Sequence, residues 1–211
     1  MKRKSKPTAV IIDYGAGNLY SLARSLEYLG VDVTVTGSAQ KVAAAERIII
    51  PGVGAFGKAM ERLEKSSLDK AVLDFAATGR PLLGICLGMQ LLAEKSFEFG
   101  VTKGLGIISG EVSPMKGEIG GLKTPHMGWN RLFIRRNDGL FNSFKNGSFV
   151  YYIHSYYVKG GGDEVKAFSE YGVEIPGVVA KNNAYGMQFH PEKSGEAGLR
   201  LLKAFCEKPC L

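Results

Sequence analysis

The sequence is poor in cysteine, histidine and tryptophan, and the shortage of cysteine narrows what the chain can be. Its three cysteines, at positions 86, 206 and 210, cannot build a disulfide framework, and an odd number of thiols is typical of a reducing compartment. We therefore expect a cytoplasmic location. Cys206 and Cys210 have no histidine or further cysteine nearby to complete a zinc site, so we expect no bound metal.

The chain also lacks a long hydrophobic run. No apolar stretch approaches the ~20 residues that cross a bilayer, so we expect no membrane partner. Four of the seven net positive charges lie within residues 1–7, which have no apolar core of a secretory signal. Such a tail could contact nucleic acid or an anionic surface. We expect instead that residues 1–7 are disordered, that residues 8–211 form a single domain, and that no nucleic acid binds.

Apolar runs of strand length alternate with helical patterns through the first half of the chain. The expected strands are Thr8–Asp13, Val31–Val35, Arg47–Ile50 and Pro81–Ile85; the expected helices are Asn18–Leu29, one or two within Lys58–Ala77, and Ser194–Cys206. This alternation predicts an α/β fold with a mostly parallel sheet covered by helices on both faces. Residues 105–188 are richer in β-branched and aromatic residues, which predicts antiparallel strands in the second half.

One cysteine stands where a predicted strand ends and a helix begins. Cys86 lies between Gly84 and Gly88, and two glycines there would remove side chains that clash in a sharp strand-to-helix turn. The turn would expose the thiol at a helix N-terminus, where the helix dipole favours thiolate. Cys86 is therefore a candidate nucleophile, with a buried structural cysteine as the alternative.

A histidine and a glutamate follow the last predicted strand. Imidazole can take a proton from a thiol and return it to a leaving amine, so His190 is the candidate base. Glu192 lies two residues further on and can share a face with His190 in an extended segment, where its carboxylate would orient the ring. The order Cys86, His190, Glu192 is that of a catalytic triad; the alternative is a surface or structural histidine.

Glycine-rich loops follow the first and third predicted strands. Gly52 and Gly54 allow backbone N–H groups to approach a bound carbonyl, and the amide of Leu87 would be a second oxyanion donor. A plain tight turn is the alternative. The first loop, Asp13–Asn18, lacks the third glycine of a dinucleotide motif because Tyr20 stands in its place, so we expect no nucleotide cofactor there.

These motifs together resemble a known family. Gly84–Gln90 and Gln188–Ser194 are similar to the corresponding segments of class I (triad) glutamine amidotransferases. Four further segments resemble, more narrowly, the glutaminase subunits of imidazole glycerol phosphate synthases: Ile12–Leu19, Pro51–Phe56, Pro125–Asn130 and Ile153–Tyr156. The resemblance extends from about Thr8 to about Phe205. It implies the three-layer class I glutamine amidotransferase fold.

The resemblance also implies an activity and a set of site residues. The activity is hydrolysis of L-glutamine without a cofactor, through catalytic Cys86, His190 and Glu192. The remaining implied residues fall into three groups: the oxyanion hole at Gly52, Val53 and Leu87; substrate contacts at Gly54, Gln90, Ser155 and Tyr156; and a partner interface at Asn18, Trp129 and Asn130. The implied partner is a separate (β/α)₈-barrel cyclase subunit, which forms a heterodimer with the glutaminase and receives its ammonia.

Alternatives remain for several residues and for the whole chain. Gln90 could instead cap a helix or face solvent, His154 could be a simple sheet residue, and Trp129 could lie in the core. The chain itself could supply ammonia to a sugar-amidating enzyme of surface polysaccharide synthesis. It could also be a catalytically silent regulatory subunit, or a cysteine peptidase or hydrolase of the wider fold.

Overall fold

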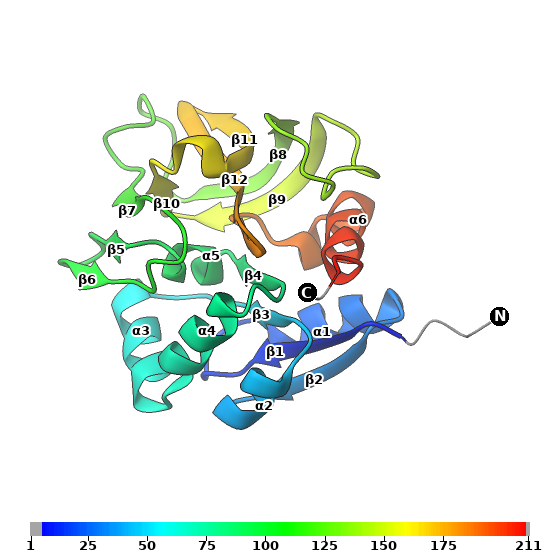
Figure 1. Ribbon diagram of the computed structural model, residues 1–211. Coiled ribbons are helices and arrows are strands. Elements are labelled where there is room, and N and C mark those ends of the chain that lie inside the picture. Colours follow the sequence, from blue (N-terminus) through cyan, green and yellow to red (C-terminus); the bar gives the residue numbers. More distant parts are fainter. Residues whose placement is uncertain (1–5, 210–211) are drawn as a thin grey trace.

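The computed structural model describes residues 6–209, and its centre is a nine-stranded mixed sheet (Figure 1). Five neighbouring strands are parallel and the remaining four continue the sheet in antiparallel fashion. In spatial order the strands are β2 (Asp32–Thr36), β1 (Thr8–Ile12), β3 (Ile48–Ile50), β4 (Leu82–Ile85), β13 (Ala184–Met187), β12 (Val173–Lys181), β11 (Val165–Tyr171), β8 (His126–Ile134) and β9 (Ser148–His154).

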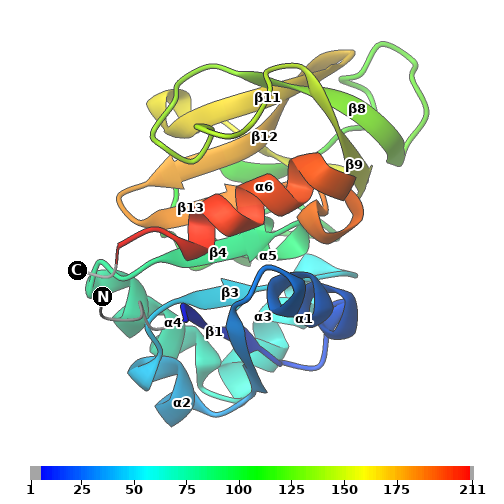
Figure 2. The same ribbon diagram turned by 90° about the vertical axis from the view of Figure 1, so that its right-hand side faces the viewer.

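Helices cover both faces of the parallel half, as the sequence predicts. Helices α1 (Leu19–Tyr28) and α6 (Gly195–Cys206) lie together on the face turned to the viewer in Figure 2. The other face carries α2 (Ala39–Ala44), α3 (Phe56–Lys65), α4 (Leu68–Ala77) and α5 (Leu87–Leu91). Side chains of β1 alternate between the faces, so Ile11 joins the α1–α6 core and Ile12 joins the α3–α4 core. Each such fully buried aliphatic side chain contributes about 1.5–3 kcal/mol to the hydrophobic term.

The predicted elements of the first half are confirmed, with shifts of one or two residues at their ends. The run 58–77 divides into α3 and α4 at Ser67, whose left-handed backbone (φ 57°) cannot continue a helix. The sequence reading missed α2, because this six-residue helix buries only Val42 and so carries little periodic signal.

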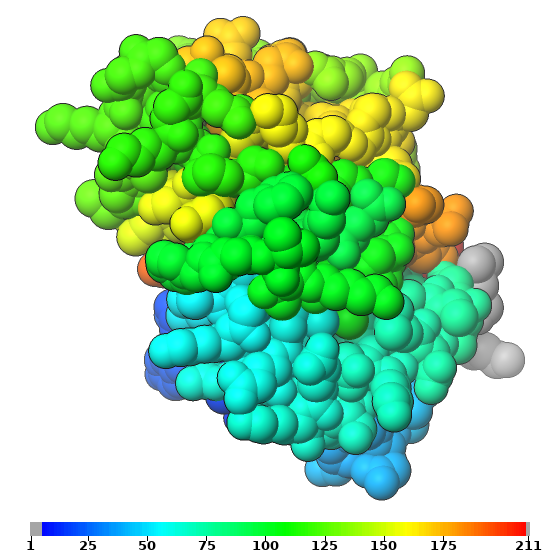
Figure 3. All heavy atoms as spheres, turned by 90° about the vertical axis from the view of Figure 1, so that its left-hand side faces the viewer, coloured from blue at the N-terminus to red at the C-terminus, as the bar shows by residue number. Residues whose placement is uncertain are grey.

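The antiparallel strands predicted for the second half are also confirmed. Besides their part of the large sheet, they form a second sheet in the order β10 (Tyr156–Lys159), β7 (Glu111–Pro114), β5 (Lys95–Ser96) and β6 (Thr102–Lys103). Figure 3 shows the green segment between α5 and β8 lying between the cyan helices and the yellow strands. Two short 3₁₀ turns complete the structure, η1 (Gly162–Glu164) and η2 (Pro191–Lys193).

The predicted N-terminal tail, residues 1–7, lies only partly within the described residues. Residues 1–5 lie outside the described residues. Within the described part, the carbonyl of Pro7 accepts a hydrogen bond from the N–H of Asp32 (2.9 Å). The chain is thus already held beside β2 one residue before β1 begins.

Candidate active site

Cys86 occupies a sharp elbow between β4 and α5. Its backbone has φ 55° and ψ −111°, an uncommon conformation for a residue with a side chain, and its N–H donates to Met187 O at 2.7 Å. A Cβ at Gly84 would lie 2.5 Å from Gly88 O, and one at Gly88 would lie 1.8 Å from Ile50 O. The two glycines are therefore required for the close packing of strand and helix that creates the elbow, as the sequence predicts.

His190 follows β13 and is paired with Glu192. The Nδ1–H of the ring donates to Glu192 Oε1 at 2.8 Å, and both side chains are buried. Burial by itself would lower the pKa of His190, but hydrogen bonding to Cys86 and Glu192 and their negative charges outweigh it and raise the pKa to about 10. Nε2, on the opposite edge of the ring, is the nitrogen left to interact with Cys86; it is buried, and it makes no hydrogen bond of ordinary geometry within the described residues. That nitrogen is the one free to exchange a proton.

The backbone around His190 is held by a residue that sequence reasoning did not single out. Ser194 Oγ donates to His190 O at 2.7 Å and accepts from the N–H of Tyr151 at 2.9 Å. The N–H of His190 in turn donates to Tyr151 O at 2.9 Å. The turn that carries the ring is thus clamped to β9.

A cavity of about 470 Å³ brings most of the predicted residues together at the carboxyl ends of the parallel strands. Eight predicted site residues line it: Val53, Gly54, Cys86, Leu87, Gln90, Ser155, Tyr156 and His190. Gly52 and Glu192 do not line the cavity. Glu192 lies behind His190, where its role would be to orient the ring.

The loop after β3 packs directly on the elbow. A Cβ at Gly52 would lie 2.8 Å from both Gly88 N and Leu87 Cβ, so only glycine permits this approach. Tyr14 Oη donates to Pro51 O at 2.8 Å and fixes the start of the loop. Leu87 opens α5, and the first N–H groups of a helix have no intrahelical partner. The two predicted groups of oxyanion donors therefore lie side by side.

Gln90 is buried and anchored, which excludes a capping or solvent-facing role. Its Nε2 donates to Tyr156 O at 2.8 Å and to Gln188 Oε1 at 3.1 Å. Since both amide protons are used within the protein, the side-chain oxygen is what Gln90 can offer a ligand. Gln188, which sequence reasoning missed as a site residue, lies with its Nε2 3.9 Å from Cys86 Sγ.

Five further residues line the cavity without having been predicted: Glu98, Phe99, Pro125, Ile153 and His154. Glu98 Oε2 accepts the N–H of Phe56 at 2.6 Å and so caps α3 from a distant loop. His154 is the last residue of β9, buried and bonded on both ring nitrogens. Its position next to Ser155 and the scarcity of histidine in the chain were the available signals.

The predicted interface residues lie at or near the surface. Trp129 is 56% exposed on β8, so the core alternative is wrong. Four large apolar side chains are exposed on β8 and the edge strand β9, and we call them the apolar strip: Met127, Trp129, Phe149 and Ile153. Asn18 caps α1, with its Oδ1 accepting from Ser21 N–H at 3.4 Å. Asn130 is half-buried.

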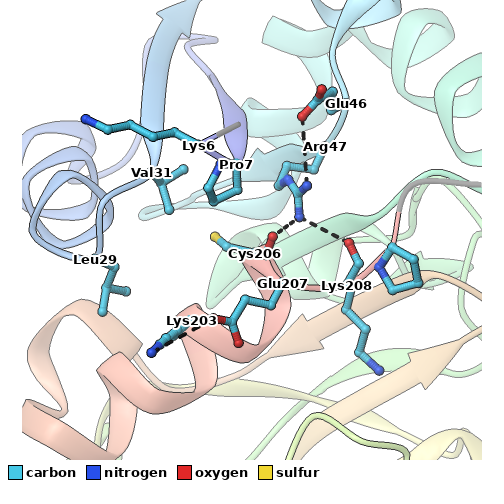
Figure 4. Close-up of a pocket in the computed structure, with 11 residues that line it drawn as sticks. Lys6, Pro7, Leu29, Val31, Glu46, Arg47, Lys203, Cys206, Glu207 and Lys208 are labelled. Carbon is cyan, nitrogen blue, oxygen red and sulfur yellow. Dashed lines mark hydrogen bonds and ion pairs between the residues drawn. The ribbon is translucent and has the colours of Figure 1, made fainter. Parts of the chain in front are cut away.

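A larger cavity, of about 840 Å³, lies at the opposite, amino ends of the parallel strands (Figure 4). Arg47 is its central polar group, but the guanidinium donates to the carbonyls of Thr8, Cys206 and Lys208 and ties α6 to β1. Burial raises the pKa of the Cys206 thiol to about 12, so it is unreactive at neutral pH. We interpret this end as structural. Cys210 lies outside the described residues.

The described chain contains no group of three or more His, Cys, Asp and Glu side chains that could hold a metal ion. No helix in this part of the chain is long and apolar enough to cross a membrane.

Comparison with known proteins identifies the family of this chain. The family model "Glutamine amidotransferase class-I" matches residues 10–208. The imidazole glycerol phosphate synthase subunit HisH of Caldanaerobacter subterraneus subsp. tengcongensis is 48% identical over 93% of this chain and 96% of its own. That of Listeria monocytogenes is 46% identical over 94% of each chain. The solved structure of PurLQS from Thermotoga maritima has a TM-score of 0.73 at 22% identity, covering 95% of this chain and 97% of that one, which shows a shared fold. The chain therefore belongs to the class I glutamine amidotransferases and, among them, to the family of imidazole glycerol phosphate synthase HisH subunits.

Proposed function

We propose that this chain, as a single domain over residues 8–211, hydrolyses L-glutamine to glutamate and ammonia through a γ-glutamyl thioester on Cys86. The ammonia passes to a (β/α)₈-barrel cyclase subunit, with which the chain forms a heterodimer for histidine biosynthesis. The observation that carries the proposal is the meeting of an elbow cysteine with a buried His190–Glu192 pair at one cavity. A catalytic thiol must stay reduced, which favours the cytoplasm.

In the first half-reaction the thiolate of Cys86 attacks the side-chain amide carbon of glutamine. Backbone N–H groups of Leu87 and of the Gly52–Val53 segment stabilise the oxygen as it becomes negative. His190 Nε2 gives a proton to the amide nitrogen, the C–N bond breaks, and ammonia leaves as the thioester forms. Glu192 keeps the ring in place through Nδ1.

In the second half-reaction water attacks the thioester carbon. His190, now neutral, takes one proton from that water, and the C–S bond breaks to regenerate the thiolate. The second proton of the water leaves the new carboxyl group to solvent as glutamate is released. Gly54, Gln90, Ser155 and Tyr156 line the cavity and are the proposed contacts for the glutamine that must stay in place through both steps.

The mouth of the cavity supports the proposed partner. Three of its lining residues are apolar and exposed, Val53, Phe99 and Ile153, and Phe99 is 88% exposed. Ile153 pairs with Met127 in the register of β8 and β9 and so joins the mouth to the apolar strip. A cyclase subunit docked on this surface would bury the apolar groups and shield the departing ammonia from water, where it would be protonated. Asn18 and Trp129 are the proposed side-chain contacts, whereas the amide of Asn130 is already bonded to Glu170 O and His126 within the protein.

The test is glutamate release from glutamine by the chain alone, with the cyclase subunit, and with the cyclase plus its nucleotide ligand. We expect strong stimulation by cyclase and ligand, absent in Cys86→Ala. Stimulation by a sugar-amidating partner in place of the cyclase would assign the chain to the other synthase. No hydrolysis with any partner, in a folded protein, would make it a silent subunit.

The docking surface has its own test. Exposed aromatic residues near the centre of an interface often carry much of its energy, so Trp129→Ala should weaken cyclase binding about tenfold or more. Tyr28→Ala is the matched control, since Tyr28 is 79% exposed at the far end of α1. Calorimetric titration of the cyclase into each variant measures both affinities. Equal affinities for the two variants would contradict the proposed surface.

A further inference from the structure

A line of hydrogen bonds runs from β8 to the cavity. Asn130 Nδ2 bonds to Glu170 O at 2.9 Å and to His126 Nε2 at 3.2 Å. His126 Nδ1 bonds to His154 Nε2 at 3.0 Å, and His154 Nδ1 bonds to Tyr156 O at 2.9 Å. His126 and His154 stand directly opposite each other in the register of β8 and β9, and both are buried.

The chemistry of the groups fixes the direction of this line. Asn130 Oδ1 accepts the N–H of Arg131 at 2.8 Å, which sets the amide so that Nδ2, a donor only, faces His126. His126 Nε2 must then be the acceptor, so its proton is on Nδ1 and is donated to His154 Nε2.

The same reasoning assigns the proton of the His154 ring. Since His154 Nε2 accepts, its proton is on Nδ1 and is donated to Tyr156 O. Burial lowers the pKa of His126 to about 4 and that of His154 to about 3, so both rings are neutral near pH 7, as an ordered line of single protons requires. One arrangement of protons therefore satisfies every group.

The line ends at a carbonyl that the site also uses. Tyr156 O accepts from His154 Nδ1–H and from Gln90 Nε2–H, which occupy both of its lone pairs. Tyr156, Gln90 and His154 all line the cavity proposed to hold glutamine. Fixing this carbonyl therefore fixes the strand end and the amide that would contact the ligand.

We propose that Asn130, His126 and His154 are positioning residues, whose one-way line of hydrogen bonds holds the Tyr156 carbonyl, and through it Gln90, in the geometry that binds glutamine. This inference rests on the proposed function, because it assigns a role in binding the same substrate. It gives two buried histidines outside the triad a task in substrate affinity rather than in proton transfer.

A rival explanation is that His126 only fills space, because its ring stacks between Tyr152 and Tyr171 with centroids 4.5 and 4.0 Å away. Two variants separate the explanations. His126→Phe keeps a flat ring but has no N–H for His154, whereas His126→Gln loses the ring but keeps a donor.

We expect His126→Phe to raise the KM for glutamine about tenfold, with kcat changed much less, and His126→Gln to restore KM to within about threefold of the parent value. The readout is glutamate release by each variant in complex with the cyclase and its ligand. The opposite order, with Phe nearly normal and Gln impaired, would overturn the proposal in favour of stacking.

A spectroscopic test measures the parent protein without a partner, and the variants serve only to assign its signals. ¹⁵N NMR of the histidine rings should show His126 and His154 neutral and protonated on Nδ1 at pH 7, with the two signals assigned by the variants. A proton on Nε2 of either ring would overturn the proposal, whatever the variants do.

A failure of the proposed function would give a different result from a failure of this inference. In that case no partner would elicit glutamate release from the parent protein, while the ring tautomers would still be as expected. The effect on binding would then be read from the half-saturating concentration of a diazoketone analogue of glutamine that alkylates Cys86. We expect the same order, with Phe weaker than Gln, and equal values would overturn the inference.

Discussion

His190 and His154 line the same cavity and are both buried, but their partners differ. His190 is hydrogen-bonded to the Glu192 carboxylate and interacts with the Cys86 thiol; against the effect of burial, these partners raise its pKa to about 10. His154 donates to a carbonyl and accepts from another imidazole, so burial prevails and lowers its pKa to about 3. Burial alone therefore does not decide the charge of a histidine; the charge of its neighbours does.

The difference matches what each ring is proposed to do. A ring that gives a proton to leaving ammonia must hold that proton at neutral pH on a nitrogen that is not tied to the orienting carboxylate; in His190 this is Nε2, since Nδ1 is bonded to Glu192. A ring that holds a carbonyl in place must keep one tautomer and have both nitrogens engaged, as His154 does. Variants that remove one partner at a time should break this contrast.

The largest effect is expected from removing the thiol. Cys86→Ala should reduce glutamine hydrolysis roughly 10⁴-fold or more, because no thioester can form and loss of a nucleophile removes most of the catalysis of a triad. Glutamate release in the presence of the cyclase measures this. Residual activity above about one per cent of the parent rate would contradict a covalent route through Cys86.

The next effect is expected from removing the carboxylate. Glu192→Gln should lower kcat roughly 10²-fold, because the amide neither orients the ring in the right tautomer nor stabilises imidazolium. The carboxylate helps to raise the pKa of His190, so its loss should move the alkaline decline of activity from near pH 10 to lower pH. The loss is measured as kcat, and the shift as the pH dependence of kcat/KM, which reports the free enzyme. An unmoved alkaline decline would show that Glu192 does not set the pKa of His190.

A smaller effect is expected in stability. His126 and His154 have pKa values below the ordinary 6.5 when folded, so the unfolded chain binds more protons and stability falls as the pH drops below 6.5. Each ring contributes up to about 1.4 kcal/mol per pH unit. His190, with a raised pKa, contributes oppositely: its stabilisation is complete below pH 6.5 and is lost as the pH rises through about 10.

Urea unfolding at pH 5 and 6.5 measures the acid side of this prediction. His126→Phe should flatten the fall in stability between these two values, because one titrating ring is gone. Its stability at pH 6.5 serves as the reference for any packing change. A slope equal to that of the parent would mean that His126 is already charged in the folded state.

The three residues of the proposed triad could be singled out from the sequence because their signals are local. Cys86 stands between two glycines at a strand end, and His190 and Glu192 are two residues apart, so neither inference required a long-range contact. The strands β1, β3 and β4 could be predicted for the same reason, since each is a short apolar run. Helix α2 and the two-residue strands β5 and β6 are too short to show a period.

The site contacts that could not be predicted from the sequence depend on strand register and on other long-range pairings. His126 and His154 meet only because β8 and β9 pair with those residues opposite each other, and a slip of one residue would move one ring to the other face. Gln188 likewise meets Gln90 of α5, and Glu98, which lines the cavity, meets the start of α3, through contacts that are distant in sequence. Trp129 is exposed because it lies on the outer face of β8, which pairs with the edge strand β9, and no local sequence pattern revealed this position.

The central claim is that Cys86 forms a γ-glutamyl thioester, and trapping that intermediate tests it most directly. The complex with the cyclase and its ligand would be mixed with glutamine, quenched in acid within the first turnovers, and measured by intact-protein and peptide mass spectrometry. The account predicts a mass increase of one glutamyl group on the peptide that contains Cys86, absent in Cys86→Ala. Glutamate release at the parent rate with no adduct on Cys86, or an adduct on another residue, would contradict it.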